Sequence, residues 1–119
     1  MLTVACIETQ NYLGLGALYV RTLKAMVARH LSTPHRFVVI TDEPGRHDLP
    51  ANEISPIVRC DKLGQLLTGW WAKLYMFEPG RVAPPGGRVL YLDLDSVIVG
   101  ALDELVRHTG AVNLRDWGW

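Results

Sequence analysis

Two acidic residues, Asp93 and Asp95, stand two positions apart in an apolar stretch of the sequence. Residues 89–92 before them and residues 97–99 after them are all apolar or aromatic. In an extended strand, side chains two positions apart point to the same side and lie about 6.5 to 7 Å apart. Two carboxylates so close in buried surroundings repel each other unless a cation lies beside them. Hard oxygen ligands suit Mg²⁺ or Mn²⁺, so the pair predicts a divalent metal site.

A metal ion held by Asp93 and Asp95 would have a definite chemical use. It could bind two phosphates and stabilise the negative charge that develops on a departing nucleoside diphosphate. Open α/β sheets bind their ligands at the carboxyl ends of the strands, where this pair is expected. The simpler alternative is that two acids merely mark the exit of a strand from the core, but their apolar flanks favour the metal site.

The elements that must position this pair can be read from the pattern of apolar residues. A β-rich run at residues 3–7 predicts a strand, and a stripe of Val20, Leu23, Val27 and Leu31 predicts a helix over residues 16–31. A second strand is expected at residues 36–41, after the helix-breaking Pro34. Strand, helix and strand in this order predict a parallel pair in an α/β fold.

The second half of the chain continues the same alternation. We expect a short strand within 53–58, a loop or helical turn at 61–67, a helix at 70–77, a tight connection at 84–87, a central strand at 88–94, a helix at 102–107 and a last strand at 111–114. The strand at 88–94 is apolar on both faces until its end, which is typical of a central strand in a parallel sheet covered by helices.

Composition limits the classes of protein that the chain can belong to. Its 119 residues fit one domain, and 12 basic and 12 acidic residues give no net charge. Proteins that bind long nucleic acids or anionic membranes normally carry a basic surplus, so no nucleic-acid partner is expected. The sequence has neither a recognisable signal peptide nor a transmembrane stretch, so we expect a cytoplasmic, soluble protein. Cys6 and Cys60 are interpreted as reduced structural thiols.

Other carboxylate motifs fit less well. Haloacid-dehalogenase phosphatases also carry D-x-D after a buried strand, but their later lysine and acidic motifs do not follow Asp95 in this sequence. The spacing of Asp93, Asp95 and Glu104 is that of an EF-hand loop. However, Val97 and Ile98 stand where that loop needs an oxygen ligand and a glycine, which excludes it.

Glycine-rich phosphate loops are also absent from the sequence. Gly14-Leu15-Gly16 follows a strand as in a dinucleotide fingerprint, but Tyr19 occupies the place of the third small residue. No G-K-[ST] phosphate loop occurs either. A nucleotidyltransferase usually opens with a basic glycine-rich loop, whereas the only charged residue before Tyr19 is Glu8.

Several short segments follow one another in an order that extends over nearly the whole chain. They are Thr9-Gln10-Asn11-Tyr12, Gly16-Ala17-Leu18, Lys73-Leu74, Tyr91-Leu92-Asp93-Leu94-Asp95-Ser96-Val97-Ile98-Val99 and Leu102-Asp103-Glu104-Leu105. In this order the sequence resembles the GT-A glycosyltransferases, most of all the family 8 type that includes glycogenin and bacterial lipopolysaccharide galactosyltransferases. The block at residues 91–105 is the most specific part of the resemblance.

The resemblance implies a fold and a donor. The fold would be a Rossmann-like GT-A nucleotide-diphospho-sugar transferase fold, with a mostly parallel sheet flanked by helices. Residues 1–119 would form a single nucleotide-sugar-binding domain, truncated before the acceptor half and so incomplete relative to a full enzyme. The donor would be a UDP-sugar bound with Mn²⁺ or Mg²⁺, and the acceptor stays unknown. Assembly into a homo-oligomer is left open.

The resemblance also implies roles for individual residues. Thr9, Asn11 and Tyr12 match the loop that holds the base of a uridine nucleotide, where a tyrosine ring can stack on uracil. Lys73 matches a lysine near the donor phosphates, although a solvated surface lysine is an equal alternative. Asp93 would reach the ribose or the metal, and Asp95 would bind the metal directly.

Two questions stay open at the level of sequence. Trp70 and Trp71 are interpreted chiefly as core residues, with a wall of the donor pocket as the alternative. The chain is expected to act as the donor-binding portion of a glycosyltransferase, a hexosyltransferase if a further acceptor half is supplied. The alternatives are a non-catalytic GT-A binding module and, less favoured, a nucleotidyltransferase.

Overall fold

The computed structural model of the chain describes residues 1–57 and 69–108. In this part, four strands form one parallel sheet in the order β3-β2-β1-β4. The strands are β1 (Leu2–Glu8), β2 (His35–Thr41), β3 (Ile54–Pro56) and β4 (Arg88–Tyr91). The predicted α/β class and the parallel pairing of the first two strands are therefore confirmed. The elements expected at residues 61–67 and 111–114 lie outside the described residues, as does Cys60.

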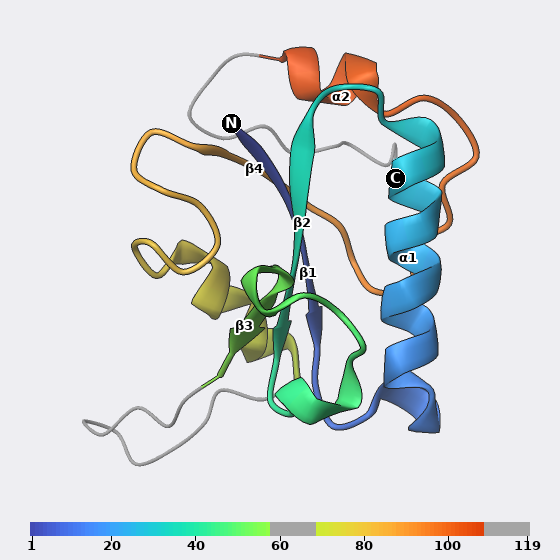
Figure 1. Cartoon of the computed structure of the whole chain (residues 1–119), viewed down its shortest axis with the longest axis vertical. Coiled ribbons are helices and arrows are strands. Elements are labelled where there is room, and N and C mark those ends of the chain that lie inside the picture. The colour runs from blue at the N-terminus through green and yellow to red at the C-terminus, as the bar shows by residue number, and fades with distance from the viewer. Residues whose placement is uncertain (58–68, 109–119) are drawn as a thin grey trace.

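Helices lie on both sides of this sheet, as Figure 1 shows. The α-helices are α1 (Gly16–His30) and α2 (Asp103–Arg107). The 3₁₀ helices are η1 (Tyr12–Gly14), η2 (Pro44–Arg46), η3 (Ala51–Glu53) and η4 (Gly69–Phe77). No helix in the described ranges is long and apolar enough to cross a membrane.

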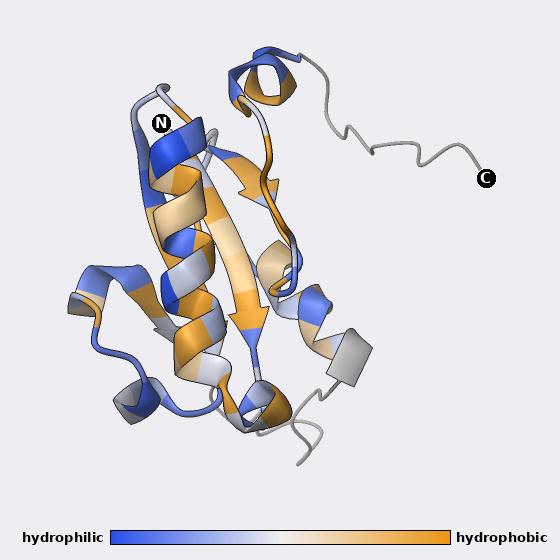
Figure 2. Cartoon of the chain, turned by 90° about the vertical axis from the view of Figure 1, so that its right-hand side faces the viewer, coloured by the Kyte–Doolittle hydropathy of each residue, from blue (hydrophilic) through white to orange (hydrophobic). Residues whose placement is uncertain are grey.

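The two faces of the sheet bury separate clusters, because successive residues of a strand point to opposite faces. On β1, Val4 and Cys6 pack in the cluster under α1, whereas Ala5 packs in the cluster under η4. On β2, the same alternation separates Val39 from Val38. Figure 2 shows hydrophobic colour along the central strands. Burial on both faces explains why these strands read as continuous apolar runs rather than alternating ones.

Helix α1 is held on the sheet by the predicted apolar stripe. Val20, Leu23 and Val27 are all buried, and Leu31 just beyond the helix is buried as well.

Beyond the C-terminal end of α1, Asp103 of α2 accepts hydrogen bonds from the backbone amides and the hydroxyls of Ser32 and Thr33. These bonds hold the pKa of Asp103 well below its usual range, with the Thr33 hydroxyl as the largest cause. Helix α2 is thereby fixed to the loop between α1 and β2.

Strand β4 differs from its prediction in length. It ends at Tyr91 rather than at residue 94, and among the described strands it lies at the edge of the sheet, next to β1 only. Its Val89 is 39% exposed. The expected end at residue 94 was therefore wrong. The strand expected at residues 111–114 lies outside the described residues, so the central position of β4 stays a prediction.

The segment at residues 69–77 is helical as predicted, but it is a 3₁₀ helix. With three residues per turn, positions three apart lie on one side of such a helix. Ala72 and Tyr75 form the buried side, while Trp71 is 70% exposed on another side. The interpretation of Trp71 as a core residue was therefore wrong. The side chain of Trp70 is not among those that the structure describes.

Candidate functional site

A pocket of about 350 Å³ opens at the carboxyl ends of β1 and β4. Three segments that are far apart in the sequence contribute to its walls. The lining residues are Ile7, Thr9, Gln10, Tyr12, Lys73, Tyr91, Asp93, Leu94 and Asp95. The structure thus brings together five residues that the sequence predicted as site residues, namely Thr9, Tyr12, Lys73, Asp93 and Asp95. The strand register explains why these residues lie together. Ala5 of β1 pairs with Tyr91 of β4, so the segments that follow the two parallel strands leave the sheet at the same edge.

Asp93 is partly neutralised by its neighbours. Its Oδ1 atom lies 2.9 Å from the Lys73 ammonium and accepts a hydrogen bond of 2.9 Å from the Tyr91 hydroxyl. Partial burial raises the pKa of Asp93, but the hydrogen bonds from Lys73 and Tyr91 outweigh this effect and bring the pKa below its usual value. Asp93 is therefore ionised at neutral pH and already engaged through one oxygen.

The Lys73 ammonium contacts the Tyr91 ring as well as the Asp93 carboxylate. The Lys73 ammonium lies 5.5 Å from the centre of the Tyr91 ring, within the range of a cation–π interaction. Burial, and then the charge of Asp93, raise the pKa of Tyr91 far above its usual value. The Tyr91 hydroxyl therefore keeps its proton and acts as a hydrogen-bond donor to Asp93.

Asp95 is exposed and has no hydrogen-bond or ion-pair partner among the described residues. It lies in a turn closed by a hydrogen bond of 3.0 Å from the Ser96 amide to the Asp93 carbonyl. The predicted setting of the pair was therefore wrong in two respects. The strand ends before Asp93, and the Asp93 side chain is 55% exposed rather than buried. Both acids nevertheless line the same pocket.

The donor set at this pocket suits a hard divalent cation in part. Asp93 and Asp95 supply carboxylate oxygens, which Mg²⁺ and Mn²⁺ prefer. Within residues 1–57 and 69–108, no group of three or more histidine, cysteine or acidic side chains could hold a metal ion. Among the described residues, Asp93 and Asp95 could serve as two ligands of an ion that takes water or phosphate oxygens at other positions, as Mg²⁺ commonly does.

Another part of the pocket lining comes from the loop that joins β1 to α1. Thr9, Gln10 and Tyr12 line the pocket from this loop. The Tyr12 ring packs edge-on against Tyr19, with ring centres 5.0 Å apart and an interplanar angle of 87°. Tyr12 is partly buried and packs against the core cluster under α1, so its ring is held in place at the pocket.

Asn11 has a different position from the other predicted residues. It does not line the pocket, and its Oδ1 accepts a hydrogen bond of 3.0 Å from the Gly16 amide at the start of α1. An oxygen acceptor at this point satisfies one of the backbone donors left free at a helix N-terminus. The structure gives Asn11 a capping contact, and its part in nucleotide binding stays a prediction.

A buried ionic network next to the pocket was not anticipated from the sequence. Glu8 at the end of β1 is fully buried, and its Oε1 lies 2.6 Å from Arg46 Nη1 and 2.8 Å from His47 Nε2. The Thr41 hydroxyl donates to the same oxygen at 3.4 Å, and the Tyr12 amide donates to Oε2 at 3.4 Å. The carboxylate of Glu8 is therefore saturated with protein partners.

Gly16 makes room for this carboxylate. A Cβ atom at Gly16 would lie 2.6 Å from the Glu8 Cδ atom, which is closer than atoms can approach. Two sequence signals could have indicated the network. Glu8 is the only charged residue before Tyr19 and directly follows an apolar strand, and a glycine opens the next helix. The partners Arg46 and His47, however, follow from the fold alone.

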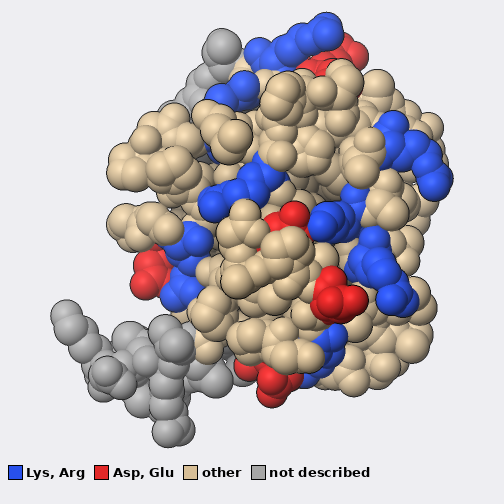
Figure 3. Space-filling model, viewed as in Figure 1, with Lys and Arg blue, Asp and Glu red and all other residues tan. Residues whose placement is uncertain are grey.

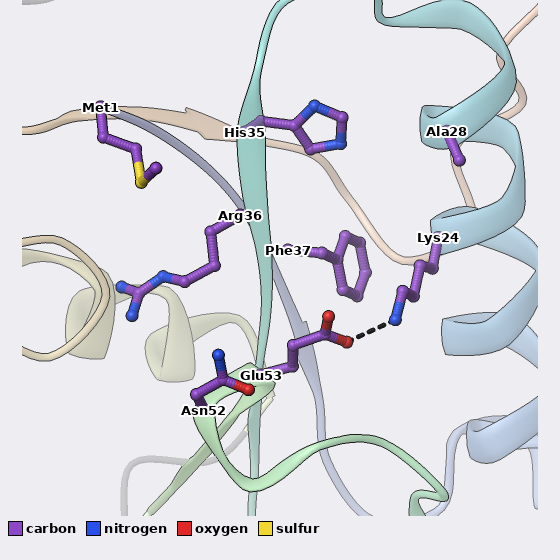
Figure 4. A pocket seen from close by; sticks show the side chains of 8 residues that line it. All are labelled: Met1, Lys24, Ala28, His35, Arg36, Phe37, Asn52 and Glu53. Atoms are coloured by element: carbon purple, nitrogen blue, oxygen red, sulfur yellow. Dashed lines mark hydrogen bonds and ion pairs between the residues drawn. The ribbon is translucent and has the colours of Figure 1, made fainter.

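A second hollow, of about 460 Å³, lies beside the start of β2 and is drawn in Figure 4. Lys24 of α1 reaches across it to Glu53, with 2.5 Å between Nζ and Oε2. Arg36 points away from that pair and donates to the Val82 carbonyl. Because these charges are paired separately and do not converge, this hollow offers no comparable set of ligand-binding groups.

Figure 3 shows basic and acidic side chains interspersed over one face of the molecule rather than gathered by sign. This distribution agrees with a ligand that is held locally rather than along a charged surface. No protein-family model, no curated protein and no solved structure was found to match the chain.

Proposed function

We propose that this chain binds a nucleoside-diphosphate sugar, most plainly a UDP-sugar, as the donor part of a GT-A type glycosyltransferase. One observation carries the proposal. Thr9 and Tyr12, Lys73, and the pair Asp93 and Asp95 come from three separate segments and line the same pocket. Segments that match a family one by one along a sequence need not lie together in the folded chain. Here, each of the three segments assigned to the donor contributes to the lining of one pocket.

The acidic pair gives the pocket its proposed chemistry. Asp95 is exposed and unpaired among the described residues, so it is the carboxylate most open to a Mn²⁺ or Mg²⁺ ion. Asp93 would add its second oxygen, since Oδ1 is engaged by Lys73 and Tyr91. The ion, when bound, would neutralise the charge that develops on the departing diphosphate.

Lys73 and the β1–α1 loop would hold the rest of the donor. The Lys73 side chain is 47% exposed and lies at the pocket, so its ammonium can turn from Asp93 to a phosphate oxygen. From the β1–α1 loop, the Tyr12 ring would stack on uracil, while the hydroxyl of Thr9 would offer a hydrogen bond to the base or ribose.

Calorimetric titration of UDP, with and without Mn²⁺, tests the proposal. We expect UDP binding to depend on Mn²⁺ and Asp95→Asn to weaken it by about tenfold or more, because the principal metal ligand is lost. Asp48→Asn serves as the matched control, since Asp48 is an exposed acid outside the pocket without a partner in the described structure. Equal affinity for UDP with and without the metal would contradict the proposed site.

Turnover separates the enzyme from a binding module. Incubation with a panel of UDP-sugars and Mn²⁺ should release UDP if the chain catalyses transfer to water or to an added acceptor. Binding without any release of UDP would support the alternative, a non-catalytic module that retains donor affinity. Binding of nucleoside triphosphates in preference to UDP would instead favour a nucleotidyltransferase.

A further inference from the structure

The pocket wall formed by the β1–α1 loop has an unusual backbone. Gln10, Asn11 and Leu13 adopt left-handed conformations, with φ of 57°, 48° and 51°. Residues other than glycine rarely adopt this left-handed backbone conformation, and they keep it only when surrounding contacts enforce it. Gln10 lines the pocket within this segment. The shape of the wall therefore depends on whatever holds the loop in place.

Asp42, directly after β2, makes the contact that bears on this strained backbone. Its Oδ2 accepts a hydrogen bond of 2.9 Å from the Gln10 amide, 32 residues away in the sequence. Its Oδ1 lies 3.3 Å from Arg46 Nη1. The two oxygens of one carboxylate thus connect the loop to the guanidinium group that also binds Glu8.

Arg46 connects this contact to the interior of the molecule. The same Nη1 atom lies 2.6 Å from the buried Oε1 of Glu8. Burial lowers the pKa of Arg46, but the hydrogen bond and charge of Glu8 and the contact with Asp42 outweigh it and raise the pKa above its usual value. Arg46 is thus a permanent cation fixed at the end of β1, and Asp42 is oriented by it.

We propose that Asp42, oriented by Arg46 and Glu8, is a positioning residue that holds the Gln10 backbone and so keeps the Thr9–Tyr12 wall of the pocket in its binding shape. Asp42 does not line the pocket and acts only through the loop. The consequence for ligand binding rests on the proposed function, whereas the ordering of the loop does not.

Amide hydrogen exchange in the whole chain tests the ordering directly. In Asp42→Ala, we expect exchange at the Gln10 amide to become about tenfold faster or more, since its acceptor is gone and the loop opens locally. Asp42→Asn keeps an oxygen acceptor and loses only the charge, so it should restore most of the protection. Asp48→Ala, an exposed acid of the same segment without a described partner, should leave the loop unchanged.

Binding of Mn²⁺ and UDP to the same variants tests the consequence. Asp42→Ala should weaken UDP binding by about tenfold, as is common when a supporting residue is removed, while Asp42→Asn recovers it. A general loss of structure would instead speed exchange in β1 and β2 as well, and the amide of Val39 in the buried centre of β2 reports this.

The outcomes are distinguishable. Unchanged exchange at Gln10 in Asp42→Ala overturns the proposal, and so does faster exchange that Asp42→Asn fails to reduce. Faster exchange confined to the loop with unchanged UDP affinity overturns the link between the wall and binding. If the unmodified chain binds no UDP, the proposed function fails, while local and rescued exchange still supports Asp42 as the residue that orders the loop.

Discussion

Glu8 and Asp95 are two carboxylates at the same edge of one sheet, and their surroundings are opposite. Glu8 is fully buried and accepts contacts from Arg46, His47 and Thr41. Asp95 is exposed and has no partner in the part of the chain that the structure describes. A buried charge is tolerated only when protein groups replace water around it, whereas an exposed and unpaired charge keeps its capacity for an external cation. The saturated carboxylate is therefore structural, and the free one is the better candidate for metal binding.

Asp93 lies between these extremes. One of its oxygens is engaged by Lys73 and Tyr91, yet its side chain is 55% exposed. Lys73 is a single ammonium on a flexible stem and can be displaced, unlike the fixed guanidinium of Arg46 beside Glu8. Under the proposed function, Asp93 would exchange the Lys73 ammonium for the metal ion that it shares with Asp95.

The largest expected difference between the two regions is in stability. Glu8→Ala leaves the Arg46 and His47 side chains beside an empty, buried position, and we expect it to lower the free energy of unfolding by about 3 to 5 kcal/mol. Asp95→Ala, at an exposed position without partners, should change it by no more than about 0.5 kcal/mol. Urea unfolding followed by circular dichroism measures both. Similar losses in the two variants would remove the distinction between a structural and a free carboxylate.

A smaller effect concerns the space around Glu8. Gly16→Ala adds a methyl group whose carbon would lie 2.6 Å from the Glu8 Cδ atom. We expect this overpacking to lower the free energy of unfolding by about 1 to 3 kcal/mol. The sign of the change in stability is informative, because helix propensity alone would make the alanine variant more stable by up to about 1 kcal/mol. Gly100→Ala, outside the helices, controls for an added Cβ atom alone, since a Cβ atom there meets nothing within 4 Å. A stabilised Gly16→Ala variant would show that Glu8 has room to move.

The scaffold could be predicted from the sequence more fully than the site. Residues 3–7, 16–31 and 36–41 gave two strands and a helix because apolar periodicity reports local burial directly. The pocket residues Lys73 and Asp93 were also identified. The exposure of Asp93 was not, since the apolar run that continues to Leu94 does not show that β4 already ends at Tyr91.

The network around Glu8 could not be predicted for a related reason. Arg46 is 38 residues from Glu8 along the chain, and neither residue belongs to a motif that indicates the other. They meet because parallel pairing of β1 with β2 brings Glu8 opposite Thr41, and the next loop then returns over that end. Local pattern reveals which residues are buried, but the pairing of charges depends on topology.

The smallest expected effect sharpens the contrast between a displaceable and a fixed cation. Lys73→Met removes the ammonium that competes for Asp93, and exposed pairs of this kind contribute about 0.2 to 1 kcal/mol. We therefore expect Mn²⁺ alone to bind about 1.4- to 5-fold more tightly, whereas UDP binding in the presence of Mn²⁺ should weaken because a phosphate partner is lost. Lys24→Met, which breaks the pair with Glu53 outside the pocket, is the matched control. Titration of Mn²⁺ by electron paramagnetic resonance, with and without UDP, measures both signs, and a loss of Mn²⁺ affinity without nucleotide would show that Lys73 does not compete with the metal.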